Sequence, residues 1–187
     1  MQHLMRQHQI KPAAQMVAEL SELLRLSMVR MDEHEVPLQD DLVVVRHYLN
    51  IESVRFGDKL RVDFAIEDET EDSLVPNLLL QPLVQNAIKH GISLRFTPGW
   101  VRLAAKRLNS RLRLTVDDDG PEFAAKAPRP REGIGLSNTR SRLQTLYGAD
   151  FRLEMASRAD GGTTVLIDLP WRKKRTGAGV LEESLAT

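Results

Sequence analysis

The stretch from residue 81 to residue 91 carries three polar side chains whose chemistry suits a bound ligand. Asn86, Lys89 and His90 stand at i, i+3 and i+4, which are neighbouring positions on a helix surface. They supply a neutral oxygen ligand, an ammonium group and an imidazole. Taken alone, the stretch leaves two interpretations open: a binding site, or the polar border of a half-buried helix.

Apolar residues beside these three predict that the helix lies on a core. They form one stripe, which consists of Leu80, Val84, Ala87 and Ile88. Pro76 is well suited to a first helical turn, so we expect the chain to enter the helix through it.

Glycines at three later places could bring backbone close to a ligand. Asp118 and Gly120 stand where a predicted strand ends, which holds a carboxylate at the mouth of a loop. Gly133 and Gly135 precede a predicted helix, whose first amides can face an anion. Two glycines precede Thr163 at the start of another strand. Each place alone is more typical of a turn.

The first part of the chain is predicted to be helical. Residues 1–12 are polar and end at a proline, which disfavours helix just before it. From Ala13 a helical pattern begins, carried by Val17, Leu20, Leu24 and Met28. After a break at 32–37 a second helix follows, and Gly57 can end it. Two such helices predict an antiparallel hairpin or a dimer interface.

The second part alternates between strands and helices, which predicts an α+β fold. The strands are expected at Leu60–Glu67, Trp100–Arg107, Arg111–Asp117, Phe151–Met155 and Thr163–Leu169. A helix is expected over Leu136–Tyr147, ending at Gly148. The loop between Asp117 and Gly135 is rich in Gly and Pro and is long enough for a lid or binding loop. After Pro170 we expect a flexible tail.

Composition excludes several classes of function. The 187 residues hold 26 basic and 26 acidic side chains, so overall charge gives no sign of nucleic-acid binding. Cysteine is absent, which removes disulfides and thiolate sites. No apolar run reaches the ~18 residues that span a bilayer, so we expect a soluble chain. The phosphate-loop, His-Glu-x-x-His and Gly-x-Ser-x-Gly motifs are also missing.

The order of these features resembles the GHKL superfamily of ATP-binding domains, and more narrowly the LytS/YehU type of sensor histidine kinase. The similarity covers about residues 13–170. It rests on these motifs: Leu20-Ser-Glu-Leu-Leu-Arg25, Tyr48-Leu-Asn-Ile-Glu-Ser-Val-Arg-Phe56, the run from Pro76 to Gly91, Gly133-Ile-Gly-Leu-Ser-Asn-Thr-Arg-Ser-Arg-Leu143, and Leu146-Tyr-Gly148.

The resemblance implies an α/β sandwich with a mixed sheet of about five strands and three helices, preceded by a helical hairpin. It divides the chain into a dimerisation region at 1–57, an ATP-binding domain at 58–170 and a tail at 171–187. It implies ATP and Mg²⁺ as cofactors. The implied cofactor-binding residues are Asn86, Lys89, His90, Asp118, Gly120, Gly133, Gly135, Leu136 and Thr163.

The resemblance also implies roles. Asn86 would hold the Mg²⁺ that bridges the phosphates, and Lys89 and His90 would meet phosphate oxygens. Asp118 would accept the adenine amino group, with Thr163 supporting it from the next strand.

The remaining implied roles belong to glycines. Gly120 would let the base approach the backbone. Gly133 and Gly135 would hinge the lid and present amides to the phosphates.

The chain departs from the family pattern at the pocket. Gln85 replaces the usual Glu before the helix Asn, and Glu122 replaces the second glycine of the usual Asp-Asn-Gly-x-Gly. Pro82 stands where gyrase-like members place a catalytic Glu, which disfavours ATP hydrolysis by that route.

A larger departure from the family pattern lies near the N-terminus. In the family, Gln-Ile-x-Pro is followed by His-Phe-Leu-Phe-Asn, whose His accepts the phosphoryl group. Here Gln9-Ile-Lys-Pro12 runs directly into Ala13. The phosphoacceptor segment is therefore missing, which leaves three explanations open: a deletion, a natural loss, or residues not represented in this sequence. The other candidate histidines lack its context: His3, His8, His34 and His47.

The resemblance implies the cytoplasmic catalytic core of a two-component kinase that transfers the γ-phosphoryl of Mg-ATP to a histidine and then to a response regulator, of LytTR type. We expect a homodimer through the N-terminal helices, a membrane-anchored parent protein and no nucleic-acid partner. Two alternatives stay open: a degenerate, non-catalytic nucleotide-binding module, and a GHKL ATPase.

Overall fold

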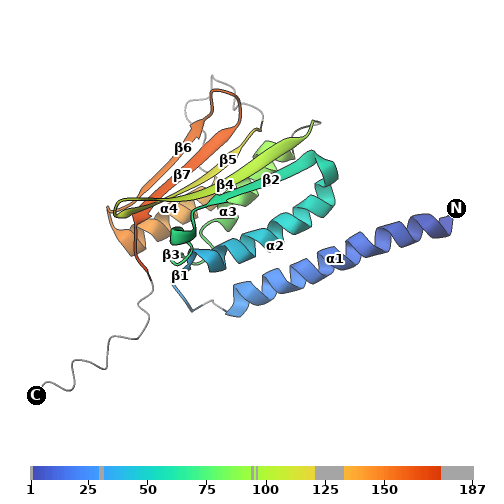
Figure 1. The fold of residues 1–187 in the computed structure, drawn as a ribbon, viewed down its shortest axis with the longest axis horizontal. Helices are drawn as coiled ribbons and strands as arrows, with labels where there is room; N and C mark the ends of the chain where they lie inside the picture. The colour runs from blue at the N-terminus through green and yellow to red at the C-terminus, as the bar shows by residue number, and fades with distance from the viewer. Residues whose placement is uncertain (1, 30–31, 94, 96, 121–132, 174–187) are drawn as a thin grey trace, which may run out of the picture.

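Five strands form one mixed sheet, and helices cover one of its faces (Figure 1). The computed structural model describes residues 2–29, 32–93, 95, 97–120 and 133–173. The helical elements are α1 (Gln2–Val29), α2 (Leu38–Phe56), η1 (Gly57–Lys59), η2 (Asp68–Thr70), α3 (Gln81–Asn86), η3 (Ala87–Ile92) and α4 (Ile134–Tyr147). The strands are β1 (Glu35–Pro37), β2 (Leu60–Ile66), β3 (Leu74–Pro76), β4 (Gly99–Leu108), β5 (Arg111–Asp118), β6 (Arg152–Ser157) and β7 (Thr163–Pro170).

The sheet confirms the predicted α+β class. Its strand order is β2-β4-β5-β7-β6. Only the β2–β4 pair is parallel, because α3 and η3 cross between these strands, and the others are antiparallel. Both predicted hairpins are present, β4–β5 and β6–β7. The first turns at Asn109, whose φ of 56° suits the left-handed region.

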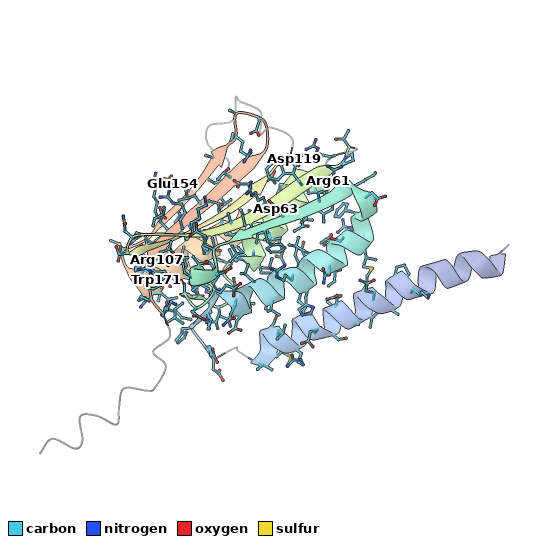
Figure 2. All side chains as sticks on the ribbon, in the orientation of Figure 1. Arg61, Asp63, Arg107, Asp119, Glu154 and Trp171 are labelled. Carbon is cyan, nitrogen blue, oxygen red and sulfur yellow. The ribbon has the colours of Figure 1, made fainter. Side chains whose placement is uncertain are left out.

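One face of the sheet is apolar, and α2, α3 and α4 pack on that side (Figure 1). Alternate residues of the central strands point into this core: Val101, Leu103, Ala105, Leu112, Leu114, Val116, Val165, Ile167 and Leu169. The opposite face carries charged side chains, among them Asp63 and Glu154 (Figure 2). The core of the domain therefore lies between the sheet and its helices.

Helix α2 belongs to this core and also packs along α1 (Figure 1). Its Leu42, Val45 and Leu49 are buried in the same cluster as the sheet residues. It ends at Gly57, as predicted, where φ is 57°. The division of the chain at residue 57 stays a prediction, and α2 contacts both sides of it.

The end of the described chain is held against the domain. The Trp171 side chain packs on the core, and the Arg107 guanidinium lies 3.6 Å from the centre of its ring. Lys173 forms an isolated β-bridge with Ser73. The rest of the predicted tail, from residue 174, lies outside the described residues.

The first helix is longer than the sequence predicted. We expected helix from Ala13, but α1 begins at Gln2 and contains Pro12. A proline removes one backbone N–H, and the turns on either side of it can still form.

The entry to the third helix also differs from the prediction. Pro76 does not start the helix; it ends the short strand β3, which pairs antiparallel with β1. The helix begins at Gln81, and Pro82 occupies its first turn. Strands of three residues leave too short a pattern to be recognised in a sequence.

The apolar stripe predicted on α1 is present but faces solvent. Val17 is 63% exposed, Leu24 53% and Met28 69%, whereas Leu23 is buried on the side of α1 that packs on α2. An exposed row of large apolar side chains is unusual for a monomer and is typical of an interaction surface.

A buried carboxylate of α2 fixes the start of α3. The Asp41 side chain is 1% exposed, and its Oδ2 accepts the backbone N–H of Leu80 at 2.8 Å. Its Oδ1 has no hydrogen-bond partner among the described residues. Burial raises the pKa of the Asp41 carboxyl to about 6.

We therefore expect Asp41→Asn to change the pH dependence of stability. Because the native carboxyl holds its proton more tightly than the unfolded one, its contribution to the unfolding free energy is highest below pH ~4 and falls as the pH rises to about 6. Asn does not titrate and keeps an oxygen for Leu80. Between pH 4 and pH 7.5 the unfolding free energy of the variant should rise relative to the wild type by about 2–3 kcal/mol.

Urea unfolding at both pH values measures this difference. Asp63→Asn, on the exposed face of the sheet, is the control and should change by no more than about 0.5 kcal/mol. A difference for Asp41→Asn that is the same at both pH values would contradict the prediction.

Candidate functional site

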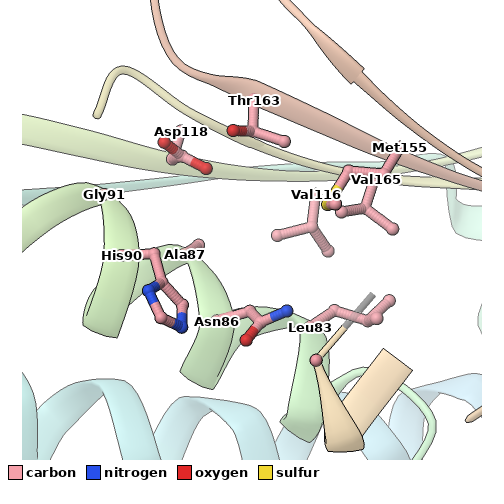
Figure 3. A pocket seen from close by; sticks show the side chains of 11 residues that line it. Leu83, Asn86, Ala87, His90, Gly91, Val116, Asp118, Met155, Thr163 and Val165 are labelled. Atoms are coloured by element: carbon pink, nitrogen blue, oxygen red, sulfur yellow. The ribbon is translucent and has the colours of Figure 1, made fainter. Parts of the chain in front are cut away.

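A cavity of about 150 Å³ lies between the helix pair α3–η3 and the sheet (Figure 3). It brings together predicted site residues from four separate parts of the chain: Asn86, His90, Asp118, Gly133 and Thr163. The Asp118 and Thr163 side chains approach from the sheet, and Asn86 and His90 approach from the helices (Figure 3). The cavity therefore has polar groups on both of its walls.

The rest of the cavity wall is apolar and was not predicted as part of the site. It consists of Leu83, Ala87, Gly91, Val116, Met155 and Val165. The alternating pattern shows that residues such as Val116 face inward, but it does not separate the wall of a cavity from a filled core. A largely apolar pocket with a few polar groups is the usual form of a small-molecule site.

The helix that carries Asn86 widens as it passes the cavity. Residues 87–92 form a π-helix, in which Ser93 N–H bonds Ile88 C=O at 2.8 Å. An i→i+5 turn advances by a smaller angle per residue than an α-turn, so the residue above Asn86 is at i+4 rather than i+3. This explains why His90 lines the cavity with Asn86 and Lys89 does not, although both His90 and Lys89 are exposed.

Asp118 is the most perturbed group in the cavity. It is 7% exposed at the end of β5, beside Thr163 of β7. Burial, and then the neighbouring carboxylates, raise the pKa of Asp118 to about 6, against the amides of Gly120 and Thr163, which lower it. The Gly120 N–H donates to Oδ1 at 2.8 Å. At neutral pH the side chain is an ionised acceptor at an apolar wall.

Glycines allow the backbone to close around this carboxylate. A Cβ at Gly91 would lie 2.7 Å from Asp118 Oδ1, and one at Gly120 would lie 2.4 Å from the Gly91 Cα. At Gly162, where φ is 86°, a Cβ would lie 1.9 Å from the Asp118 carbonyl oxygen. Side chains at these places would displace Asp118, so the close approach requires glycine.

Other predicted residues lie beside the cavity or away from it. Leu136 is buried in the core, and Gly135 packs near Pro82. Gln85 is exposed on α3 and does not line the cavity. Glu122 lies outside the described residues. The roles of these residues stay predictions.

The described residues fit a magnesium ion only if the ligand supplies most of its oxygens. No group of three or more His, Cys, Asp or Glu side chains that could hold a metal occurs in the described ranges. Mg²⁺ bound with substrate phosphates needs only one or two protein ligands and keeps several waters. The single amide of Asn86, on the cavity wall, fits that pattern.

Comparison with protein families decides what kind of domain this is. Residues 71–173, which hold the whole cavity, match the family described as histidine kinase-, DNA gyrase B- and HSP90-like ATPase, and residues 1–60 match a histidine kinase family. The chain belongs to the histidine kinase-, DNA gyrase B- and HSP90-like ATPase family. This confirms the resemblance predicted from the spaced glycines and the Asn86 helix.

Several of its curated relatives are sensor histidine kinases. The chain is 34% identical over 173 residues to sensor histidine kinase YesM of Bacillus subtilis, covering 91% of this chain and 30% of the relative. It is 34% identical over 160 residues to sensor histidine kinase BtsS of Escherichia coli, covering 86% of this chain and 28% of the relative. The chain thus spans about three tenths of the length of these relatives.

Solved structures of histidine kinases share the fold. The histidine kinase domain from the Erythrobacter litoralis EL346 blue-light activated kinase aligns with a TM-score of 0.57 at 26% identity, over 83% of this chain and 74% of that one. The catalytic domain of histidine kinase ThkA aligns at 0.56 with 21% identity, over 75% and 97%. Within the described residues, no helix is long and apolar enough to cross a membrane.

Proposed function

We propose that this chain is the catalytic core of a LytS/YehU-type sensor histidine kinase, which binds Mg-ATP and transfers its γ-phosphoryl group to a histidine. The observation that carries the proposal is the buried Asp118 carboxylate, which faces Asn86 and His90 across an apolar cavity. A carboxylate offers only acceptors and suits an adenine amino group, and a neutral amide suits a cation already bound to phosphates.

The chain's own residues would mainly bind and orient the nucleotide. Asp118 would accept from the base, Asn86 would hold Mg²⁺, and His90 would contact phosphate oxygens; Lys89 does not line the cavity, so its role stays a prediction. Bound Mg²⁺ supplies neutralisation of the phosphate charge. Phosphoryl transfer depends on positioning and charge stabilisation, which is the kind of catalysis these residues can provide.

No histidine of this sequence is assigned as the phosphoacceptor, because the family's acceptor segment has no counterpart in it. His47 is paired with Glu19 across the α1–α2 contact, with Nδ1 2.5 Å from Oε2, and Asn50 donates to the same carboxylate at 3.1 Å. These contacts give His47 a structural role between the helices. His34 lies in the connection between α1 and α2, and His90 lines the nucleotide cavity.

A degenerate binding module is the second candidate. The Gln85 substitution and the missing phosphoacceptor segment favour it. Calorimetric titration with Mg-ATP separates the two functions, because an intact pocket should bind with a Kd in about the micromolar to millimolar range. Absence of binding would favour the module, and steady release of phosphate would favour a GHKL ATPase instead.

The partners proposed for the chain follow from the family. We infer a homodimer through α1, a response regulator of LytTR type, and a membrane-anchored parent protein whose kinase core lies in the cytoplasm. The exposed α1 row, Val17, Leu20, Leu24 and Met28, supports the homodimer, because a second copy would remove these side chains from water.

Self-phosphorylation tests the missing acceptor. With γ-labelled ATP the purified chain should bind nucleotide but incorporate no label, because the family's acceptor histidine has no counterpart in its sequence. The positive control is a chain with His-Phe-Leu-Phe-Asn and its helix inserted after Pro12, which should become labelled. Label on the unmodified chain would show that another histidine serves as acceptor.

Asp118→Asn should weaken ATP binding by about tenfold or more, because an amide cannot offer two acceptors to the base and a charge-assisted bond is roughly twice as strong as a neutral one. Calorimetry at pH 7.5 measures the change. Asp63→Asn removes a carboxylate from the open face of the sheet and should bind ATP as the wild type does. Equal affinity of Asp118→Asn and wild type would remove Asp118 from the site.

Charged substitutions in the exposed apolar row of α1 test the proposed dimer. Leu20→Glu with Leu24→Glu should shift sedimentation from dimer to monomer, because association would bury two carboxylates against apolar side chains. ATP affinity should stay the same, since the cavity lies on the far side of α2 and α3. Arg25→Gln, an exposed change on the same helix, is the control. Dimers that persist in the double variant would place the interface elsewhere.

A further inference from the structure

Three consecutive carboxylates stand at the end of β5, and each has different surroundings: Asp117 and Asp118 are its last residues, and Asp119 follows it. Asp117 points to the open face of the sheet, where its Oδ1 accepts the Thr164 hydroxyl at 2.5 Å. The Arg158 guanidinium approaches the same oxygen at 3.6 Å. Asp117 therefore has both a hydrogen-bond donor and a cation beside it.

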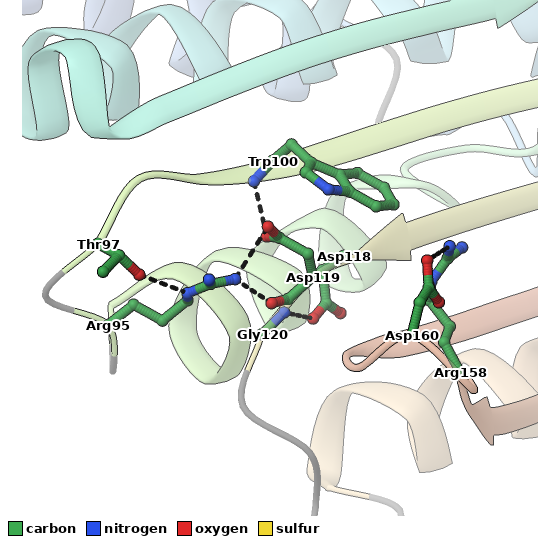
Figure 4. A network of polar contacts seen from close by, with 8 residues as sticks. All are labelled: Arg95, Thr97, Trp100, Asp118, Asp119, Gly120, Arg158 and Asp160. Carbon is green, nitrogen blue, oxygen red and sulfur yellow. Dashed lines mark hydrogen bonds and ion pairs between the residues drawn. The ribbon is translucent and has the colours of Figure 1, made fainter.

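Asp119 has a closer cation beside it than Asp117 does (Figure 4). The Trp100 N–H donates to its Oδ1 at 2.7 Å, and Arg95 Nη1 lies 2.9 Å from its Oδ2. Arg95 also donates to the Asp119 backbone carbonyl and, through Nε, to Thr97 Oγ1 at 3.3 Å. Arg95 and Asp119 are about three quarters buried, so their ion pair is less screened by water than a surface pair.

Asp118, between them, has no ion pair with a cation in the described part of the chain. Its hydrogen bonds come from backbone amides, and its carboxylate faces the cavity. The charged or titratable groups around it are Asp117 on β5, Asp119 just after β5, Arg95 after η3, His90 on η3 and Arg158 just after β6.

We propose that Arg95 is a positioning residue for the nucleotide site: by pairing with Asp119 it neutralises the nearest competing carboxylate and leaves Asp118 as the ionised acceptor for the base. Arg158 neutralises Asp117 on the other face in the same way, but more weakly, because its guanidinium lies 3.6 Å from that carboxylate. This inference rests on the proposed function, since it assigns the role of Asp118 to an adenine base.

The proposed effect of Arg95 on the pKa of Asp118 has a direction that can be measured. Without Arg95, the negative charge of Asp119 acts on Asp118 uncompensated, and a like charge favours the protonated form. The pKa of Asp118, already raised to about 6 by burial, would then rise further. Removing the Asp119 charge as well should reverse this effect.

The test compares Arg95→Gln with the double variant Arg95→Gln, Asp119→Asn. Carbon-13 NMR of the carboxyl group gives the titration midpoint of Asp118 in the free protein, and calorimetry gives Mg-ATP affinity at pH 6 and pH 8. Arg95→Gln should raise the midpoint by about one pH unit. A shift from about 6 to about 7 reduces the ionised fraction about fivefold at pH 6 and by about a tenth at pH 8, so affinity should fall about fivefold only at the lower pH.

The double variant should restore both the midpoint and the affinity, because the amide oxygen that Asp119→Asn introduces can still accept from Trp100 without adding charge. Arg102→Gln, which removes the partner of Asp63 on the open face, should change neither. An equal loss of affinity at both pH values that Asp119→Asn does not restore would overturn the proposal, because it would show a purely structural role. An unchanged midpoint in Arg95→Gln would overturn it too.

The two proposals can fail separately. If the wild type binds no ATP at either pH, the proposed function fails. A shifted midpoint in the free Arg95→Gln variant would then still support the electrostatic role of Arg95, because that measurement uses no nucleotide.

Discussion

The close approach of three backbone segments around Asp118 is the constraint on which the site depends. The end of η3, the end of β5 and the start of β7 meet at Gly91, Gly120 and Gly162, where a single added carbon would overlap its neighbours. These segments are far apart in the sequence, so the contact forms only when the sheet and its helices have packed. Correct assembly of the core and formation of the cavity are therefore the same event.

Assembly of the core destabilises the ionised form of the Asp118 carboxylate. Packing apolar walls around Asp118 removes water from its carboxylate and raises its pKa to about 6. Folding would be more favourable with a neutral side chain there, at the loss of the ionised acceptor. A raised pKa at a cavity wall is typical of a functional site, where stability is given up for binding.

Strong local patterns made much of the fold predictable. The β4–β5 and β6–β7 hairpins, helix α4 and the end of α2 at Gly57 follow from alternation, helical spacing and turn residues. Asp118 and Thr163 were predicted as site residues because they stand at the end of one strand and the start of another, and Asn86 because it shares a helix face with His90. The short strands β1 and β3 were missed, and Pro76 was misplaced, because their positions depend on pairing between distant segments.

Other features depend on three-dimensional packing and had no sequence signal. The spacing of Asn86, Lys89 and His90 was interpreted as an α-helical turn, and the π-helix separates Lys89 from the other two. The apolar row of α1 was correctly recognised as helical. Helical spacing could not show that the row faces solvent, because that depends on which side of α1 packs on α2.

The helix that presents Asn86 and His90 is held at both ends by buried carboxylates. Asp41 accepts the N–H of Leu80 where α3 begins, and Asp118 lies against Gly91 where η3 ends. Burial raises the pKa of each to about 6, so both would lose their charge over the same range of mildly acidic pH. Protonation would weaken the hydrogen bond that Asp41 accepts at the start of α3, and it would remove the negative charge of Asp118 from the cavity wall at the end of η3. The position of the Asn86 helix and the charge of the cavity wall thus depend on two carboxylates, one at the start of α3 and one at the end of η3.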